Sequence, residues 1–557
     1  MSSTNQPLSP PTSTAVQPPD PESHADSVSH FCLVLDQAEI SHHVLHYAYQ
    51  GAGTAESPFL VELLPGDPFD PMAFPKWRKW TITFLLAIAS LAVAFASTAY
   101  SSGMEDIAQQ FRVSSEVALL GLSLFILGLA VGPLLWAPLS EEYGRQYLFI
   151  GTYTAHVVFN AGAAAAQNIE TLIILRFFAA FFGAAPYTNS NAVLADMFPA
   201  SERGLAMTLF GAAPFLGPAL GPIAGGFLGA AGGWRWIQGL MASFTGVSLI
   251  LCTICVPETY APVLLRRRAA KLSKITGKVY VSSVDAHQSR QSVGQVLRRT
   301  LLRPWILLFR EPIVLLTAIY LAVIYGTLYL FFAAFPIVYQ YQRGWPAGVS
   351  GLAFSGTAVG MAASILYVAA YDNKRYARLV TAGGGTAPPE ARLPVAIIGS
   401  VWVTVGLFWF AWTNGRNVHW IVSIMASGFF AAGMVFVFVG IINYLIDSYV
   451  VYAASVLAAN TVIRSLFGAA FPLFTTQMYK NIGIHWASSV PAFLALGCLP
   501  VPFLFYRYGE SIRAKCKYAA EAAVILAKMR TRREVVPEGS ASIEYENRQT
   551  GETVLRS

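Results

Sequence analysis

Two arginines that lie inside apolar stretches are the first residues in this chain that could do chemistry. Arg176 and Arg464 each fall within a run of about twenty mostly apolar residues. An ionised side chain there costs at least a few kcal/mol, and it usually faces a bundle interior or a water-filled cavity. At helical spacing Arg176 shares a face with Tyr187 and Asn191, and Arg464 shares one with Asn460. We predict that both stripes serve a cavity or proton coupling; structural ion pairs or side chains that reach the membrane surface are the alternative.

An aromatic stripe offers a second kind of contact. Tyr325, Tyr329, Phe332 and Tyr339 recur at near-helical intervals in one apolar segment. Such rings can stack on a flat apolar substrate while their hydroxyls orient it. The stripe therefore predicts a substrate-binding surface, although aromatic residues that face lipid show the same pattern.

A glycine and proline run lies in the apolar stretch from residue 205 to residue 229. Its members are Gly217, Pro218, Gly221, Pro222, Gly225 and Gly226. In lipid such residues are tolerated, because neighbouring helices satisfy the freed backbone groups and a bare glycine face allows close approach. The run predicts a kinked, tightly packed membrane helix.

A charged turn follows the second apolar segment. It contains Glu141, Gly144 and Arg145. Charged pairs at such a turn can hold two helix ends together in one conformation and release them in another. We predict a conformational gate here, with a plain surface turn as the alternative.

The elements that must position these residues are membrane-spanning helices. The chain is 55% hydrophobic and only 12% charged, against roughly 25% charged in an ordinary soluble protein. Apolar windows of about twenty residues give roughly a dozen spans, and the longest gap between them divides the set into six and six. The sequence predicts an all-α polytopic membrane protein with two six-helix bundles around a central cavity. The predicted units are a disordered cytosolic tail (1–79), a first bundle (80–256), a cytosolic linker (257–311), a second bundle (312–507) and a second cytosolic tail (508–557).

Charge distribution predicts orientation. Lysine and arginine crowd the regions before the first span, in the linker, between residues 374 and 392 and after the last span, which places both termini and the linker in the cytosol. The net charge of +7 is explained by this topology rather than by nucleic-acid binding.

The five cysteines show no metal-ligand spacing, and no phosphate-binding glycine-lysine motif is present, so we expect no metal, no cofactor and no ATP-driven pump.

These residues together resemble the major facilitator superfamily, and more closely its twelve-span fungal drug:proton antiporters. The charged turn is similar to the family's motif, with Ala137 where the family has glycine. The glycine and proline run resembles the antiporter motif, which is associated with exporters. Arg176 resembles the arginine of the fourth span, and Asp196 follows as the family pattern implies. Residues 234–236 and 257–265 match segments of the fungal branch, as does the stretch around Asp447, which we expect to act as a gate or structural residue.

The resemblance implies a proton-coupled secondary transporter, and not an enzyme, that exports apolar or amphipathic small molecules such as xenobiotics, fungicides or a self-made toxic metabolite. We expect a monomer in the plasma membrane whose partners are its substrate, protons and lipid. Two alternatives remain: an importer of a nutrient such as a vitamin or polyamine, and a non-transporting membrane sensor. No span centre holds an aspartate or glutamate, so the sequence does not place the coupled proton.

Overall fold

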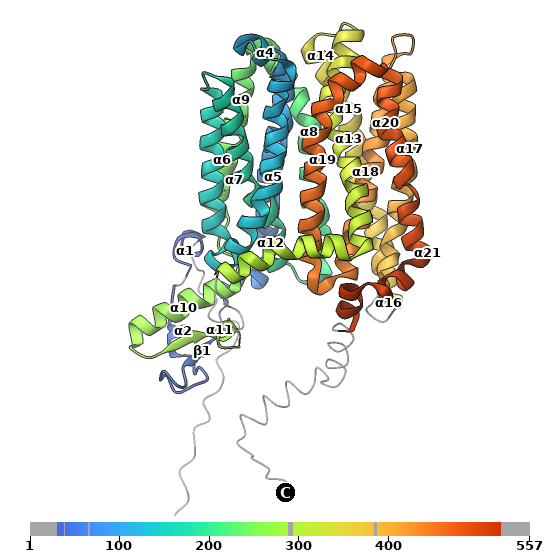
Figure 1. Cartoon of the computed structure of the whole chain (residues 1–557). Helices are drawn as coiled ribbons and strands as arrows, with labels where there is room; N and C mark the ends of the chain where they lie inside the picture. Colours follow the sequence, from blue (N-terminus) through green and yellow to red (C-terminus); the bar gives the residue numbers. More distant parts are fainter. Residues whose placement is uncertain (1–29, 38, 65–66, 288–292, 384–386, 525–557) are drawn as a thin grey trace, which may run out of the picture.

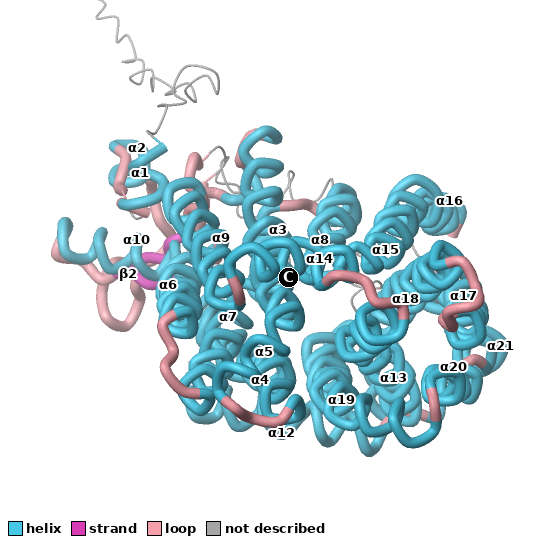
Figure 2. The backbone as a smooth tube through the Cα atoms, turned by 90° about the horizontal axis from the view of Figure 1, so that it is seen from above, coloured by secondary structure: helices cyan, strands magenta, loops and turns pink. Residues whose placement is uncertain are grey.

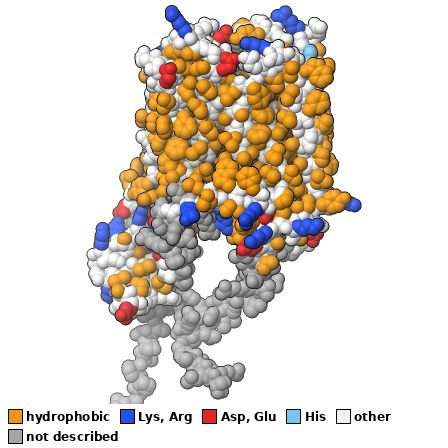
Figure 3. Space-filling view, in the orientation of Figure 1, with side chains coloured by type: hydrophobic (Ala, Val, Ile, Leu, Met, Phe, Trp, Pro, Cys, Tyr) orange, Lys and Arg blue, Asp and Glu red, His pale blue; other side chains and the backbone are white. Residues whose placement is uncertain are grey.

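The computed structural model describes residues 30–37, 39–64, 67–287, 293–383 and 387–524. In this part of the chain, eleven helices are long and apolar enough to cross a membrane. Helix α6 (Arg145–Ala164) packs beside them against α7 and α9, and its buried His156 and Asn160 make it more polar than the rest. Exposed apolar side chains form a broad band around the molecule, and charged side chains gather at its two ends (Figure 3). This is the surface expected of a protein that sits in a bilayer.

Two groups of helices stand side by side (Figures 1 and 2). The first contains α3 (Lys76–Ala99), α5 (Ser115–Tyr143), α6, α7 (Ile169–Met197), α8 (Ala200–Gly232) and α9 (Trp234–Cys255), with α4 (Met104–Phe111) at one end. The second contains α13 (Pro312–Phe335), α14 (Ala347–Gly351), α15 (Ser355–Tyr367), α16 (Asn373–Ala382), α17 (Leu393–Thr413), α18 (Trp420–Ser448), α19 (Ala453–Ile482), α20 (Ile484–Cys498) and α21 (Pro500–Lys515). Helix α5 packs on α19, and α8 packs on α14 and α15, so these pairs join the two halves.

The segment between the halves lies across one end of the molecule, which we call the linker end; the opposite end is the far end. The segment contains α10 (Ala261–Thr276), β2 (Tyr280–Ser282), α11 (Ser283–His287) and α12 (Val293–Arg310). Helix α12 runs beneath both halves and contacts α5, α13 and α19 (Figure 1). The linker is therefore packed against the bundles it connects.

The segment before α3 corrects one prediction. The sequence predicts a disordered tail through residue 79, but its described part contains α1 (His30–Leu35), α2 (His42–His46) and β1 (Phe59–Val61). Strand β1 pairs in parallel with β2 of the linker. Asp67 forms a buried ion pair with Arg268 of α10. The predicted tail looked too polar to fold because its apolar partners, Leu265 and Leu272, lie two hundred residues away. Residues 1–29 and 525–557 of the two predicted tails lie outside the described residues.

The glycine and proline run forms a close helix contact, as predicted. A Cβ atom on Gly217 would lie 2.6 Å from the Cβ of Ala94, and one on Gly221 would lie 2.3 Å from Oγ1 of Thr98, so α8 and α3 touch through their backbones. Pro222 lacks an N–H, which leaves the carbonyl of Pro218 without its helical donor. Thr98 Oγ1 donates to that carbonyl at 3.1 Å. The neighbouring helix thus restores the hydrogen bond that proline removes.

The next glycines extend this contact to the other half. A Cβ on Gly225 would lie 2.7 Å from the carbonyl oxygen of Ala99 in α3, and one on Gly226 would lie 3.0 Å from that of Ala347 in α14. On the partner side, a Cβ on Gly351 would meet the Pro222 carbonyl oxygen at 2.4 Å. The run therefore binds α8 to α3 within its own half and to the start of α14 across the interface, near the far end.

Candidate functional site

Arg464 lies in the interior, where the two halves meet. It lies eleven helical steps after Ala453, the first residue of α19, which is roughly 17 Å at 1.5 Å per residue. Its guanidinium carbon lies 5.2 Å from the ring centre of Tyr325 and 5.6 Å from that of Phe438. Within the described residues no hydrogen bond or ion pair holds this guanidinium, and its buried Nε has no acceptor.

The residues around Arg464 come from both halves. Tyr187 of α7 is close enough to Tyr325 and Arg464 to interact with both electrostatically. Phe215 of α8 and Phe438 of α18 meet edge to face across the interface, with ring centres 5.6 Å apart. Tyr187, Tyr325 and Arg464 all keep part of their surface exposed. The arrangement provides one cation and several ring faces at the boundary between the two halves.

Arg176 occupies a different environment. It is completely buried, and its Nε donates to the carbonyl of Gly121 at 2.8 Å. One terminal nitrogen donates to the carbonyls of Ala96 and Ser97 at 3.2 and 3.4 Å, and the guanidinium lies over Tyr100, 4.1 Å from the ring centre. Arg176 therefore ties α7 to α3 and α5 and reaches the interface only through Ser97.

Ser97 connects this buried arginine to the other half. Its carbonyl accepts from Arg176, and its hydroxyl lies 3.2 Å from the hydroxyl of Tyr329 in α13. Tyr325 donates to Tyr329 at 3.4 Å. Polar contacts thus link Arg176 to Tyr325 through Ser97 and Tyr329. The guanidinium of Arg464 lies against the ring of Tyr325. Of the remaining polar residues predicted for the cavity, Asn191 is exposed, and Asn460 is buried with Oδ1 unpaired while its Nδ2 donates to the carbonyl of Val456.

The structure divides the predicted aromatic stripe. Tyr325 and Tyr329 face the other half, whereas Phe332 and Tyr339 pack inside the second half. Phe332 stacks on Phe354 with ring centres 5.0 Å apart, and Tyr339 shares a hydrogen bond of 2.9 Å with the Ser423 hydroxyl. The structure thus brings only the first two aromatic residues to the boundary between the halves.

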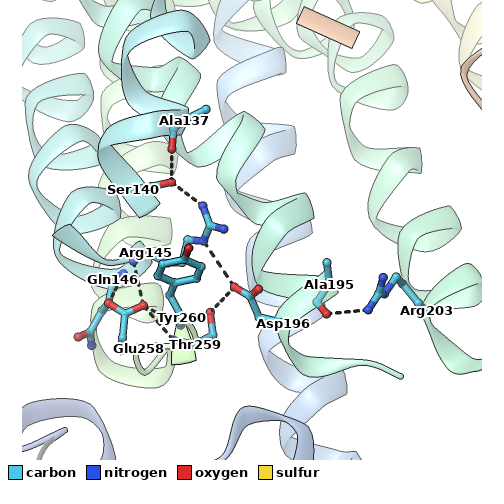
Figure 4. Close-up of polar contacts among 10 residues, drawn as sticks. All are labelled: Ala137, Ser140, Arg145, Gln146, Ala195, Asp196, Arg203, Glu258, Thr259 and Tyr260. Atoms are coloured by element: carbon cyan, nitrogen blue, oxygen red, sulfur yellow. Dashed lines mark hydrogen bonds and ion pairs between the residues drawn. The ribbon is translucent and has the colours of Figure 1, made fainter. Parts of the chain in front are cut away.

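The predicted gate residues Arg145 and Asp196 meet at the linker end (Figure 4). Arg145 Nε lies 3.4 Å from a carboxylate oxygen of Asp196 at the end of α7, and NH1 donates to the Ser140 hydroxyl at 2.5 Å. The guanidinium also lies 4.7 Å from the ring centre of Tyr260. Burial, with the nearby Glu141 carboxylate as the next cause, raises the pKa of Tyr260, so this phenol stays neutral. Glu141 itself is exposed and joins no ion pair in the described part of the chain.

Glu258 organises this region, and sequence reasoning gave it no role. Its carboxylate accepts from the backbone N–H groups of Arg145 at 2.8 Å and Gln146 at 3.2 Å, at the start of α6. It also accepts from Thr259 and Tyr260, both at 3.0 Å. A carboxylate suits this place, because a helix N-terminus presents free donors and a positive dipole end.

Gly144 makes room for that carboxylate. Its φ is +100°, and a Cβ atom there would lie 2.2 Å from Oε2 of Glu258. Any other residue would be strained and would collide with the carboxylate. The sequence signal for this carboxylate is the segment at residues 257–265, which resembles the fungal branch but predicts no role for Glu258.

Asp447 takes part in a similar network in the second half. It accepts from Arg392 Nε and from the Tyr376 hydroxyl, both at 3.0 Å. Glu390 pairs with Arg513 of α21 at 2.8 Å. Arg392, Glu390 and Arg513 carry no sequence signal for this site, because ion pairs between residues far apart in the chain leave no periodic pattern.

Comparisons with known proteins agree with this architecture. A sequence profile described as Major Facilitator Superfamily matches residues 86–472. The chain belongs to the major facilitator superfamily. It is 58% identical over 502 residues to a protein of Trichophyton rubrum named MFS-type efflux pump MFS2, covering 90% of this chain and 84% of that protein. It is also 56% identical to the major facilitator superfamily multidrug transporter mdrA of Aspergillus fumigatus, over 93% and 85% of the two chains.

The other matches extend the same result. The chain is 40% identical to the ascochitine biosynthesis cluster MFS transporter of Didymella fabae, over 84% and 91% of the two chains. A solved structure of the proton:xylose symporter XylE shares the fold, with a TM-score of 0.55 and 15% identity over 78% of this chain and 96% of that one. The protein is thus an efflux transporter of this superfamily, a class of transporters and not of enzymes.

Proposed function

We propose that this transporter exports apolar or amphipathic small molecules across the plasma membrane in exchange for protons. The single observation that carries the proposal is the polar and aromatic cluster of Arg464, Tyr325, Tyr329 and Ser97 at the boundary between the halves. A ligand there touches both halves, so it can favour one relative arrangement of them over the other. Only such differential binding lets a ligand drive a conformational change.

The proposal places the linker end in the cytosol. Basic side chains concentrate there, on α10, α12, α16 and the end of α21. Such an excess marks the cytosolic side of membrane proteins. Substrates then leave toward the far end, where Gly226 and Gly351 bring the halves into backbone contact. We expect a monomer, because each chain supplies both halves of the site.

The substrate range follows from relatives and from the cluster. Relatives named as a multidrug transporter and as a biosynthesis-cluster transporter support xenobiotics or a self-made metabolite as cargo. The rings of Tyr187, Tyr325 and Phe438 support a flat, partly apolar molecule. Names of relatives as efflux pumps argue against the importer and the sensor.

A dye-retention assay tests this function. The full chain is expressed in a yeast strain without its own drug exporters, cells are loaded with a fluorescent amphipathic dye, and retention is measured with and without a proton uncoupler. Export predicts lower retention than in vector-only cells, and the uncoupler should abolish the difference. Export that persists with the uncoupler would refute proton coupling. Greater dye uptake by expressing cells would favour an importer, and unchanged dye content with every dye would favour a sensor.

A further inference from the structure

Arg464 and Arg176 are the two arginines within the membrane-spanning interior, and only one has its charge satisfied. Arg176 donates to three backbone carbonyls, lies on Tyr100 and is fully buried. Arg464 has ring faces beside it, no acceptor for its Nε and no ion pair in the described residues. The Nε–H group of Arg464 is buried without an acceptor, and a donor left unpaired in an apolar setting is costly.

Carboxylates that could neutralise Arg464 are absent from the middle of every predicted span. Asp196 and Asp447 lie at the linker end and already pair with Arg145 and Arg392. The titratable groups near Arg464 in the described residues are phenols, those of Tyr187, Tyr325 and Tyr329. No carboxylate of the described residues offsets the charge of Arg464, so this cation is free to pair with an anionic group of a ligand.

We propose that Arg464 binds the negatively charged group of the exported molecule, so that the preferred substrates are flat, amphipathic organic anions such as aromatic carboxylates. The guanidinium fork matches the two oxygens of a carboxylate. The rings of Tyr325 and Phe438 provide faces for the apolar part of the same molecule. This inference rests on the proposed export function, and it narrows that function from amphipathic molecules in general to anions.

The membrane potential also favours the export of an anion over that of a cation. An anion that leaves a negatively charged cytosol moves with the membrane potential, whereas an exported cation moves against it. A positive binding site would therefore select substrates whose export needs the least work from protons.

Two dyes with one ring system and opposite charge test the proposal. Fluorescein carries a carboxylate on a xanthene frame, and rhodamine 6G is a cationic xanthene ester. Binding of each to the purified full-length protein in lipid nanodiscs is measured by fluorescence polarisation. The wild type should bind fluorescein more tightly than rhodamine 6G. Arg464→Gln should weaken fluorescein binding by about tenfold or more, the usual size of a charge-assisted contact, and change rhodamine 6G binding less than twofold.

Further variants separate charge from folding. Arg464→Glu should reverse the preference between the dyes, and Arg464→Lys should keep part of the fluorescein affinity. Arg507→Gln is the matched control, because Arg507 is an exposed arginine on α21 away from the boundary. Arg176→Gln should lower thermal stability without changing the ratio of the two affinities in the folded fraction.

Equal binding of the two dyes by the wild type, no fluorescein binding, or an unchanged ratio in Arg464→Glu would each overturn the anion site. Failure of export is separable from these. If the purified protein prefers fluorescein but expressing cells retain it as long as vector-only cells do, the export function is wrong and the anion site stands.

Discussion

At the linker end, each half has an arginine–aspartate ion pair, but the residues that surround the pair differ between the halves. In each half an arginine at the start of the third spanning helix pairs with an aspartate at the end of the fourth: Arg145 with Asp196 of α7, and Arg392 with Asp447 of α18. In each half a tyrosine ring lies against that arginine. The first half adds a carboxylate, Glu258, from the segment after α9, whereas the second half adds a cation, Arg513, from the last turn of α21. We call the arginine–aspartate pair of each half its latch. The two halves share the geometry of the latch but not the sequence around it.

The buried carboxylates show the same contrast. Glu258 accepts four backbone N–H groups of the first half. Glu311, just before α13, is equally buried but accepts from the Tyr449 hydroxyl at 2.8 Å and from the backbone N–H of Tyr518 at 3.1 Å. Glu258 is thus held entirely by backbone donors, which do not titrate, whereas Glu311 accepts from one side chain as well as one backbone group. We therefore expect the first half to tolerate substitution less.

Removal of Glu258 should have the largest effect. Glu258→Ala leaves the N–H groups of Arg145, Gln146, Thr259 and Tyr260 without their acceptor, which should cost roughly 3 kcal/mol. Thermal unfolding of the purified protein, followed by intrinsic fluorescence, measures the loss. Glu311→Ala is the matched variant in the second half and should cost less than half as much, because it leaves two donors without their acceptor rather than four, and the Tyr449 hydroxyl can turn toward another partner. A larger effect in Glu311→Ala would reverse the comparison.

Substitution of the latch aspartate should also cost more stability in the first half than in the second. Asp196→Asn weakens the partner of Arg145, whose side chain is 9% exposed, while Asp447→Asn weakens that of Arg392, which is 18% exposed. We expect losses of about 2 and about 1 kcal/mol respectively, since charge-assisted contacts weaken with exposure. Initial efflux rates of a loaded dye, corrected for protein level, give the functional counterpart. Equal losses in the two variants would show that exposure does not decide the strength of the latch.

Much of the frame was accessible from the sequence. The close contact of α8 with α3 follows from Gly217 and Gly221, because only a glycine face permits backbone contact. Arg145 and Asp196 were found through their motif. Arg392 was counted only as a topology signal, since its pairing with Asp447 depends on how a loop folds back on a helix end fifty-five residues later.

Local sequence patterns do not predict the surroundings of Arg176 and Arg464 or the small core before α3. Arg176 and Arg464 both look like cavity residues by spacing, yet carbonyls of α3 and α5 enclose one, and phenyl and phenol rings flank the other. The apolar residues before α3, such as Val44 and Val61, are too sparse to indicate a core until α10 supplies the rest of it. Tertiary partners decide these cases, and a single sequence does not name them.

A charge swap should separate the side-chain contact of Glu390 in the second half from the backbone contacts of Glu258 in the first. Glu390→Arg and Arg513→Glu should each destabilise the protein, and the double variant should recover most of the loss, with a coupling energy of about 0.5–1 kcal/mol. Glu258 offers no such rescue, because its partners are backbone groups. Double-mutant analysis of thermal unfolding measures the coupling. A double variant no better than the sum of the single ones would mean that this ion pair contributes nothing.

The pH response of Cys516 gives the smallest and most local test. Burial, followed by the nearby Glu311 carboxylate, raises the pKa of this thiol to about 11. In a variant that keeps only this cysteine, iodoacetamide should react slowly at pH 8 and about tenfold faster with each unit of pH up to pH 10, because only the thiolate reacts. Glu311→Gln removes the second cause, so the profile should move to lower pH while staying above that of the denatured chain, since burial remains. The raised pKa also means that the folded state holds its proton while the unfolded state loses it, so this site should lose stability as pH rises from about 9 to about 11. A profile that matches the denatured chain would show that Cys516 lies in water and is not buried beside Glu311.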